Sequence, residues 1–340
     1  MKEYTPDWFA SVIPGRLTIE AHEEIWPLRH PFRISRGSRT EAHIVVVTVT
    51  DGKHIGRGEG VPLARYNQSV ASVVAQIESV RGEKNLSRQT LQDLLPAGAA
   101  RNALDCAFWD LEAKISGKRV WELANTPNVR EVETSFTISL DTAERMAAAA
   151  KTNGELPILK LKLGGNDRDL ARVEAVREAA PETRLLIDAN ESWSLQHYKN
   201  VVPELKRLRV ELIEQPFPAN SDEVLETLDR PIPVCADESC HTTADLARLT
   251  NRYEGINVKL DKTGGLTEAL RLCERAQNAG FKLLIGCMVC TSLAIAPAQL
   301  LASFANWVDL DGPLLLAHDR PQGLSYRNAR IGLPDPALWG

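Results

Sequence analysis

The segment ILKLKLGGNDRDLARVEAVREAAPETRLLIDA (158–189) contains two short apolar runs that a polar stretch separates. The runs at 158–163 and 184–189 have the length of buried strands, and the stretch at 167–180 has the composition of a helix. A strand, a helix and a second strand in this order form the unit from which parallel sheets are built. The segment therefore predicts an α/β fold.

The same unit repeats on both sides of this segment, from about residue 132 onward. Further strands are predicted at SFTIS (135–139), VELIEQ (210–215), IPVCAD (232–237), GINVKL (255–260), FKLLIG (281–286) and WVDLDG (307–312). Repeated strand–helix units give a parallel sheet, and eight of them imply a closed barrel. The helical pattern between the last two strands is the weakest.

The sequence before residue 130 follows a different pattern. HIVVVTVTDG (43–52) predicts a strand that ends in a turn, because β-branched residues precede Asp-Gly. The alternating glycines at 56, 58 and 60 then predict a loop, and helices are expected at 69–80 and 100–117. Strands followed by helices indicate an α+β unit.

The composition excludes several classes of protein. The 340 residues carry a net charge of −5, which argues against a nucleic-acid-binding protein. No stretch approaches the roughly 20 apolar residues of a membrane span, and the first residues lack the apolar run of a signal peptide. Only Cys287 and Cys290 form a CxxC pair, so reduced cysteines are favoured over a zinc site or a redox pair. We expect a cytoplasmic protein without nucleic-acid or membrane partners, and a homo-oligomer remains possible.

Three acidic residues stand at the ends of consecutive predicted strands. Asp188, Glu214 and Asp237 are separated by 214 − 188 = 26 and 237 − 214 = 23 residues, each about one strand–helix unit. Barrel enzymes carry their functional residues at these carboxyl ends, so the three should converge. Converging carboxylates repel unless a cation joins them, and oxygen ligands with open positions favour Mg²⁺. One such acid alone is typical of a surface, but three in register predict a Mg²⁺ site.

Three lysines accompany these acids. Lys160 and Lys162 are two apart on the second barrel strand, so both point to one side, and Lys259 ends the sixth strand. A lysine inside a barrel is costly unless it has a partner or a function. Neighbouring cations, together with the metal, lower a lysine's pKa towards neutrality, and such a lysine can act as a general base. We therefore predict catalytic lysines with lowered pKa values.

The eighth strand adds Asp309 and Asp311 among apolar neighbours. A carboxylate pair there suits a substrate ammonium group, although a solvated strand end is the alternative. The loop HPFRISRGSR (30–39) carries three arginines that are candidates for pairing with a substrate carboxylate or for a solvated surface role: Arg33, Arg36 and Arg39.

Several motifs in the sequence resemble one known family. The chain resembles the muconate-lactonising subgroup of the enolase superfamily in KLK (160–162), DAN (188–190), EQP (214–216), ADES (236–239), NVKLDKTGG (257–265) and the capping-domain helix ARNALDCAFWDLEAK (100–114). Within that subgroup it resembles the bacterial L-Ala-D/L-Glu epimerases in GCMVCTS (286–292) and DLDGP (309–313). The resemblance covers about residues 20 to 318.

The resemblance implies a domain organisation. It implies a modified TIM barrel, (β/α)₇β, at residues 131–314 and an N-terminal α+β capping domain at residues 1–130, to which the tail 315–340 returns. An extension of roughly fifteen residues precedes the first strand and departs from the family pattern.

The resemblance also implies an activity. It implies an isomerase that epimerises dipeptides of the L-Ala-D-Glu type, with Mg²⁺, by two-base proton transfer through an ene-diolate, in the recycling of murein peptides. Asp188, Glu214 and Asp237 would bind Mg²⁺. Lys162 and Lys259 would be the two acid–base catalysts, and Lys160 would help to neutralise the bound carboxylate. Asp309 and Asp311 would hold the free ammonium group of the dipeptide. Beside this resemblance, Arg36, Cys287 and Met288 are further candidates for contact with the substrate.

Other interpretations remain open. A lyase or cycloisomerase of the same fold, such as o-succinylbenzoate synthase or muconate cycloisomerase, shares the lysines and acids but needs no acidic pair for an ammonium group. A dipeptide epimerase with a different side-chain specificity is a second alternative. A catalytically silent barrel is expected to have lost a ligand or a lysine, and none is lost here.

Overall fold

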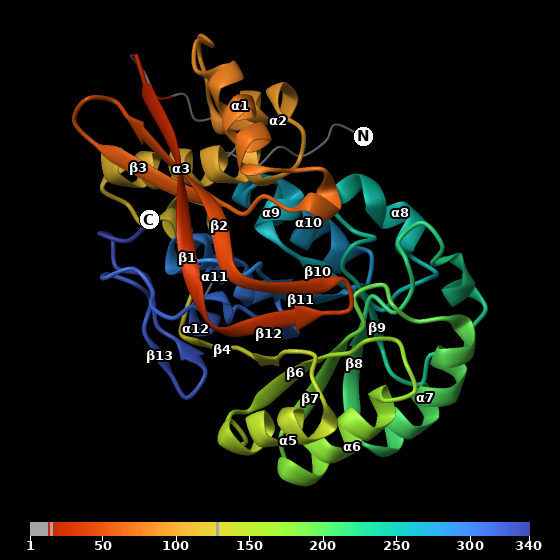
Figure 1. Ribbon diagram of the computed structural model, residues 1–340. Coiled ribbons are helices and arrows are strands. Elements are labelled where there is room, and N and C mark those ends of the chain that lie inside the picture. Colours follow the sequence, from red (N-terminus) through yellow and green to blue (C-terminus); the bar gives the residue numbers. More distant parts are fainter. Residues whose placement is uncertain (1–12, 14–15, 127–128) are drawn as a thin grey trace.

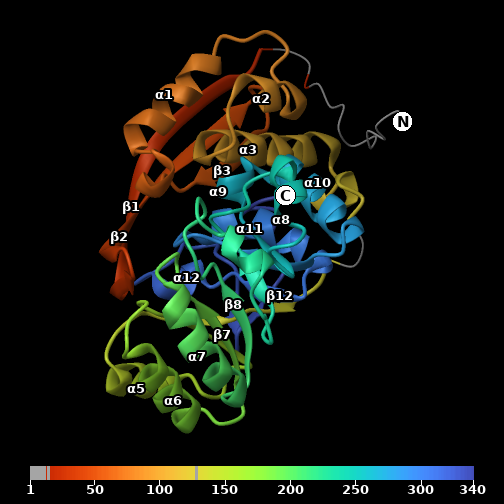
Figure 2. The same ribbon diagram turned by 90° about the vertical axis from the view of Figure 1, so that its right-hand side faces the viewer.

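The computed structural model describes residues 13, 16–126 and 129–340. Most of the N-terminal extension therefore lies outside the described residues. Figure 1 shows two parts, a small sheet with helices near the N-terminus and a larger barrel, and the turned view in Figure 2 shows the first part lying over one end of the second. The predicted fold class, an α/β barrel with an N-terminal α+β unit, is confirmed.

The barrel contains every strand that the sequence predicts. In order, its strands are β5 (Phe136–Ile138), β6 (Ile158–Lys162), β7 (Arg184–Asp188), β8 (Val210–Glu214), β9 (Val234–Ala236), β10 (Gly255–Val258), β11 (Lys282–Gly286) and β12 (Trp307–Asp309). Neighbours in sequence are neighbours in the sheet, and the pairs are parallel. The backbone N–H of Ser135 donates to the carbonyl of Val308 (2.9 Å), which joins the two ends of the sheet.

Helices connect most of these strands. They are α5 (Ala143–Thr152), α6 (Asp169–Ala179), α7 (Leu195–Arg207), α8 (Leu246–Leu249), α9 (Leu260–Thr263), α10 (Leu266–Asn278), α11 (Ser292–Gln299) and α12 (Gly312–Leu315). Between β8 and β9 the structure has only the 3₁₀ helix η3 (Glu223–Glu226). The weak pattern before the last strand has a physical reason, because every residue of α11 is buried and the helix shows no polar face.

The inside of the barrel changes from apolar to charged along the strands. At the first and middle residues of the strands, one cluster of buried side chains lies inside the barrel: Ile158, Leu186, Leu212, Cys235, Leu284 and Trp307. On β6, Lys160 and Lys162 follow Ile158 at intervals of two, so they lie on the same inner face but nearer the carboxyl end. The charged side chains at the carboxyl ends of the strands therefore lie on one side of this apolar layer.

The N-terminal unit has its own sheet and core. Its strands β1 (Thr18–Ile34), β2 (Gly37–Thr50) and β3 (Ile55–Gly60) are antiparallel. Four α-helices follow, α1 (Val70–Val80), α2 (Arg88–Leu94), α3 (Ala99–Ser116) and α4 (Val120–Leu123). The side chains of Ser69 and Ser87 cap α1 and α2, which explains where these helices begin.

The alternating glycines form strand β3, so the predicted loop at this place is wrong. A Cβ atom on Gly56, Gly58 or Gly60 would lie within 2.3 Å of a backbone carbonyl oxygen of α3. Because side chains alternate along a strand, the period of two puts all three glycines on the face that touches the helix. Glycine here allows close contact between the backbones of a strand and a helix.

Replacement of Gly58 by alanine should therefore destabilise the protein. Its Cβ would lie 2.1 Å from the carbonyl oxygen of Ala103, and such overpacking costs about 3 kcal/mol. Gly82→Ala is the matched control, because nothing lies within 4 Å of its Cβ position. Chemical denaturation should show a lower midpoint for Gly58→Ala alone. Equal midpoints for the two variants would contradict the packing argument.

The C-terminal residues contact the N-terminal unit. A small sheet forms from β4 (Val132–Glu133), β13 (Tyr326–Arg327) and β14 (Arg330–Ile331). Beyond it, the indole N–H of Trp339 donates to the carbonyl of Cys106 (3.0 Å), and the backbone N–H of Gly340 donates to Asp110 (2.7 Å). The predicted domain boundaries stay a prediction. In the part of the chain that the structure describes, no helix has the length and apolarity needed to span a membrane.

Candidate active site

Charged side chains occupy five consecutive strand ends at the carboxyl side of the barrel. Lys162 ends β6, Asp188 ends β7 and Glu214 ends β8. The strand register pairs Lys162 with Asp188 and Asp188 with Glu214, so these three lie at one level. Asp237 and Lys259 come one residue after β9 and β10. All five are buried, which means that the fold, and not the solvent, must balance their charges.

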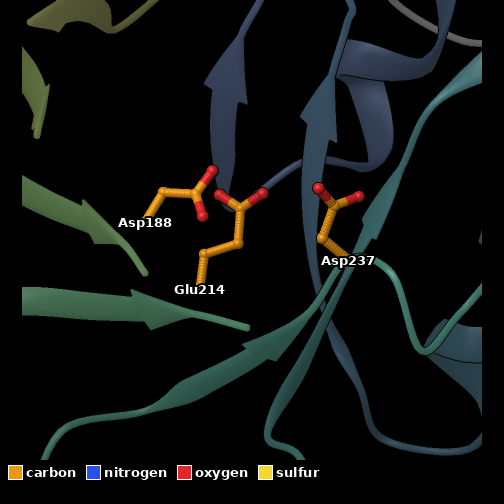
Figure 3. Close-up of side chains that lie close together, drawn as sticks. All are labelled: Asp188, Glu214 and Asp237. Carbon is orange, nitrogen blue, oxygen red and sulfur yellow. The ribbon is translucent and has the colours of Figure 1, made fainter. Parts of the chain in front are cut away.

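The three carboxylates meet in the middle of this row. Each of Asp188, Glu214 and Asp237 offers an oxygen, and these atoms lie within 4.8 Å of one another. Figure 3 shows the three carboxylates turned towards one another. Burial, together with the neighbouring carboxylates, raises the pKa of Glu214 to about 7. An arrangement of three hard oxygen donors that resists full ionisation fits a divalent cation such as Mg²⁺, which keeps positions for further oxygen ligands.

The predicted lysines surround these carboxylates. Lys162 lies 2.5 Å from Oδ2 of Asp188, and Lys259 lies 2.6 Å from Oδ2 of Asp237. Lys160 lies 2.6 Å from Oε2 of Glu214. The structure therefore pairs each lysine with a different candidate metal ligand.

The lysine pKa values were predicted to be lowered by neighbouring amines together with the metal, and the protein's own groups alone do not lower them. Burial acts to lower the pKa of Lys259, but the carboxylates of Asp237 and Glu214 outweigh burial and raise that pKa. The pKa of Lys160 is raised in the same way, against burial, by the carboxylates around it. The reason is geometric, since the nearest charge to each amine is a carboxylate and not another amine. A cation held by those carboxylates would act in the opposite direction.

Lys162 and Lys259 face each other across the barrel. Their strands, β6 and β10, are four positions apart in a sheet of eight. Four of eight positions is half of the circumference of a closed barrel. The two amines therefore approach the centre from opposite sides, with the three carboxylates on the arc between them.

A pocket of about 350 Å³ lies over this centre, which is within the range of small-molecule sites. The barrel part of the chain contributes to its lining the three lysines, Asp237, Asp309, Asp311, Cys287 and Met288. The N-terminal unit covers it with Phe32, Ile34, Arg36, Arg39, Leu63 and Tyr66.

Asp309 ends β12 and Asp311 comes two residues later, and both line the pocket. Asp309 accepts a hydrogen bond from the hydroxyl of Ser135 (2.6 Å) and lies 2.6 Å from Lys160. Asp311 accepts one from the backbone N–H of Thr137 (2.6 Å). Burial and the charge of Asp309 raise the pKa of Asp311 to about 7. A cationic group in the pocket would stabilise both acids in their charged form.

The three loop arginines differ in their partners. Arg33 pairs with Asp141 (2.6 Å) and does not line the pocket. Arg36 lines it, but its guanidinium pairs with Glu238 (2.8 Å) and Glu191 and donates to a backbone carbonyl. Among the described residues, Arg39 has no carboxylate within ion-pair distance, and burial and Arg36 lower its pKa. Arg39 is thus the loop arginine with an unpaired charge in the pocket.

Some residues of the site were missed by the sequence analysis. Asn257 donates from its side chain to Oε1 of Glu214 (2.7 Å), and Lys262 lies 2.6 Å from Oδ1 of Asp237. Asn257 has a signal in the sequence, because it is two residues before Lys259 and so lies on the same face of the strand. Lys262 has none of this kind, since it lies in helix α9 and not at a strand end.

Comparison with known proteins identifies the family. Residues 16–124 match the N-terminal domain of mandelate racemase / muconate lactonizing enzyme, and residues 141–335 match the family described as enolase C-terminal domain-like. The chain therefore belongs to the mandelate racemase / muconate lactonizing enzyme family of the enolase superfamily, as its motifs indicated.

Two curated relatives are similar over most of the chain. L-Ala-D/L-Glu epimerase of Escherichia coli (strain K12) is 46% identical over 320 residues, which are 93% of this chain and 99% of the relative. N-acetyl-D-glutamate racemase of a Pseudoalteromonas species is 44% identical over 87% of this chain and 95% of the relative. The chain is accordingly an enzyme, an isomerase of the racemase and epimerase kind.

Two solved structures have the same fold as this chain. An enolase family member from Agrobacterium tumefaciens with homology to dipeptide epimerases, bound to sodium and L-Ala-L-Glu, has a TM-score of 0.93 and 47% identity, and the match covers 95% of this chain and 100% of that one. A dipeptide epimerase from Methylococcus capsulatus, complexed with Mg and L-Arg-D-Lys, has a TM-score of 0.87 and 29% identity over 95% of this chain and 99% of that one.

Proposed function

We propose that this chain is a Mg²⁺-dependent dipeptide epimerase that interconverts L-Ala-D-Glu and L-Ala-L-Glu. The observation that carries the proposal is the row of five strand ends, with a lysine at each end and three carboxylates between them. The names and bound dipeptides of the related proteins support the substrate class. A role in recycling murein peptides in the cytoplasm follows from the same resemblance.

The cation site would serve to stabilise negative charge. Asp188, Glu214 and Asp237 would hold Mg²⁺, which when bound supplies a positive charge against the substrate carboxylate. Lys160, buried between Glu214 and Asp309, adds a second positive charge that the fold holds in place. Removal of an α-proton beside a carboxylate creates a second negative charge, so this concentration of positive charge is what the reaction needs.

The two opposed lysines would move the proton. Lys162, as the free amine, takes the α-proton from one face of the substrate, while protonated Lys259 delivers a proton to the other face. The configuration of the carbon is inverted, and the roles of the two lysines are exchanged in the reverse direction. Because these amines lie on opposite sides of the barrel, neither can serve both faces.

The acids of the last strand would select the amino end of the substrate. Asp309 and Asp311 line the pocket from the end of β12, which is four positions from β8 in the sheet of eight, so a positive group that reaches both acids would lie on the side of the pocket opposite the strand of Glu214. One additional amino-acid residue supplies about 3.5 Å of reach. This geometry favours a dipeptide with a free ammonium group over a free amino acid.

For the side chain of the epimerised residue we propose Arg39, in place of Arg36, as the partner. Arg39→Met should lower kcat/KM for L-Ala-L-Glu about 100-fold, because a charged hydrogen-bond pair is lost, and should leave L-Ala-L-Met within a fewfold of wild type. Steady-state kinetics with both dipeptides would measure this difference. An equal loss of kcat/KM on both substrates would show that Arg39 maintains the conformation of the loop and does not select the side chain.

Racemisation of an N-acylated glutamate is the second candidate. The 44% identity with N-acetyl-D-glutamate racemase supports it, as does the pairing of Asp309 with Lys160, which leaves less negative charge for an ammonium group. The two candidates share the cation site and both lysines, so only the amino end of the substrate distinguishes them.

A substrate panel in D₂O, followed by ¹H NMR with Mg²⁺ present, would test these proposals. We expect L-Ala-L-Glu to lose its glutamate α-proton signal and to give the second diastereomer. A higher kcat/KM for N-acetyl-L-glutamate would establish the second candidate instead. Turnover of an acid without an amino group, and of neither of these compounds, would favour the lyase or cycloisomerase interpretation.

A further inference from the structure

Lys262 is a fourth lysine beside the candidate cation site, and the two-base chemistry does not use it. Its Nζ lies 2.6 Å from Oδ1 of Asp237, and it donates to the backbone carbonyls of Asp237 (2.6 Å) and Asn257 (2.8 Å). The residue is 1% exposed and is not among the residues that line the pocket. Any effect of Lys262 on the reaction must therefore pass through Asp237, because Lys262 does not contact the substrate pocket.

Lys259 contacts the same carboxylate, but its partners are of a different kind. Its Nζ donates to Oδ2 of Asp237 (2.6 Å) and lies 3.8 Å from Oε1 of Glu214. Both of these partners are candidate cation ligands. Lys259 is thus held by groups whose charge a bound cation would engage, whereas Lys262 is also held by two backbone carbonyls that no ligand displaces.

The local structure explains how two lysines reach one carboxylate. Lys259 is the N-cap of the short helix α9, and the backbone N–H of Lys262 donates to the carbonyl of Lys259 (3.0 Å). The three-residue spacing puts the second lysine one turn further on. One amine consequently faces the pocket, and the other lies behind Asp237, between the ends of β9 and β10.

We propose that Lys262 is a positioning residue that stays on Asp237 as its permanent counter-charge, orients this carboxylate for the cation, and leaves Lys259 free for proton transfer. The inference rests on the proposed cation site and on the proposed two-lysine chemistry. Without Lys262, the remaining cationic partner of Asp237 would be Lys259, and an amine held in that pair is less available to a substrate.

Positioning and simple electrostatics predict opposite effects on cation binding. If Lys262 only adds positive charge beside the site, its removal should strengthen the binding of a divalent cation. If it orients Asp237, its removal lets the carboxylate turn away, and contacts that orient a ligand are worth about 10- to 100-fold in metal affinity. The direction of the change therefore decides between the two hypotheses.

Titration of the full chain with Mn²⁺, without substrate, would make this measurement. We expect Lys262→Met to bind Mn²⁺ at least about tenfold more weakly than wild type, and Lys259→Met to bind it equally or more tightly. Lys206→Met, at an exposed position on α7, is the control and should bind as wild type does. Equal or tighter binding by Lys262→Met would overturn the inference. A wild-type chain that binds no Mn²⁺ would instead overturn the proposed cation site.

If thermal unfolding shows that Lys262→Met does not fold, a second variant can take its place. Lys262→Gln keeps an amide donor for the carbonyl groups but removes the positive charge beside Asp237, and it should weaken Mn²⁺ binding as Lys262→Met does. In either folded variant, at saturating Mg²⁺, kcat should fall at least about tenfold while KM changes little, because Lys262 does not line the pocket. A kcat equal to that of the wild type would contradict the proposal that Lys262 leaves Lys259 free for proton transfer.

Discussion

Replacement of either Lys162 or Lys259 by alanine should abolish epimerisation. Each of these two amines lies on its own side of the barrel, so neither can take over the other's face of the substrate. A positioned acid or base contributes about 10² to 10⁴ in rate, and inversion needs both, so the loss should reach at least about a thousandfold. The measurement is the rate of diastereomer interconversion by ¹H NMR.

The same variants should separate proton exchange from inversion. In D₂O, each single variant should still exchange the α-proton of one diastereomer, because the remaining lysine can remove and return a proton on its own face. Lys162→Ala and Lys259→Ala should act on opposite diastereomers. Lys206→Ala, which changes an exposed lysine, should behave as wild type. Full epimerase activity in either active-site variant would eliminate the two-base mechanism.

Loss of the cation, or of a carboxylate that binds it, should have an effect of similar size. Glu214→Gln preserves the shape of a fully buried side chain but removes one of three negative charges. Since contacts that merely orient a metal ligand are worth about 10- to 100-fold in affinity, the loss of a ligand should weaken Mg²⁺ binding by more than about 100-fold. Glu223→Gln, at an exposed position of the 3₁₀ helix η3, is the matched control.

Chelation provides an independent test of the same claim. Treatment of the wild type with EDTA should remove all activity, and added Mg²⁺ should restore it. Activity that is indifferent to the chelator, or a Glu214→Gln variant with the Mg²⁺ dependence of the wild type, would show that the three carboxylates serve another purpose.

The sequence predicts the barrel and its strand ends because both follow from local periodicity. Segments such as 158–162 and 184–188 are apolar runs of strand length, and the rule that functional residues end barrel strands selects Asp188, Glu214 and Asp237 without further information. The structure brings these three together within 4.8 Å. Their roles, like those of the lysines, stay proposals until they are tested.

The features that the sequence analysis missed depend on contacts between distant segments. Lys160 and Asp309 are 149 residues apart in the chain, and their pairing, which raises the pKa of Lys160, cannot be read from local spacing. The glycines of β3 predict a loop by composition, and only their contact with α3 shows why a strand needs them. Arg36 pairs with Glu191 and Glu238, and these two acids likewise come from distant segments, the loops that follow β7 and β9.

A crystal structure of the chain with Mg²⁺ and L-Ala-D-Glu would test the central claim most directly. We expect the carboxylate of the epimerised residue on the cation, and the Nζ atoms of Lys162 and Lys259 on opposite faces of its α-carbon, each at about 3 to 3.5 Å. Either amine turned away from that carbon, or a substrate carboxylate bound elsewhere than on the cation, would contradict the account.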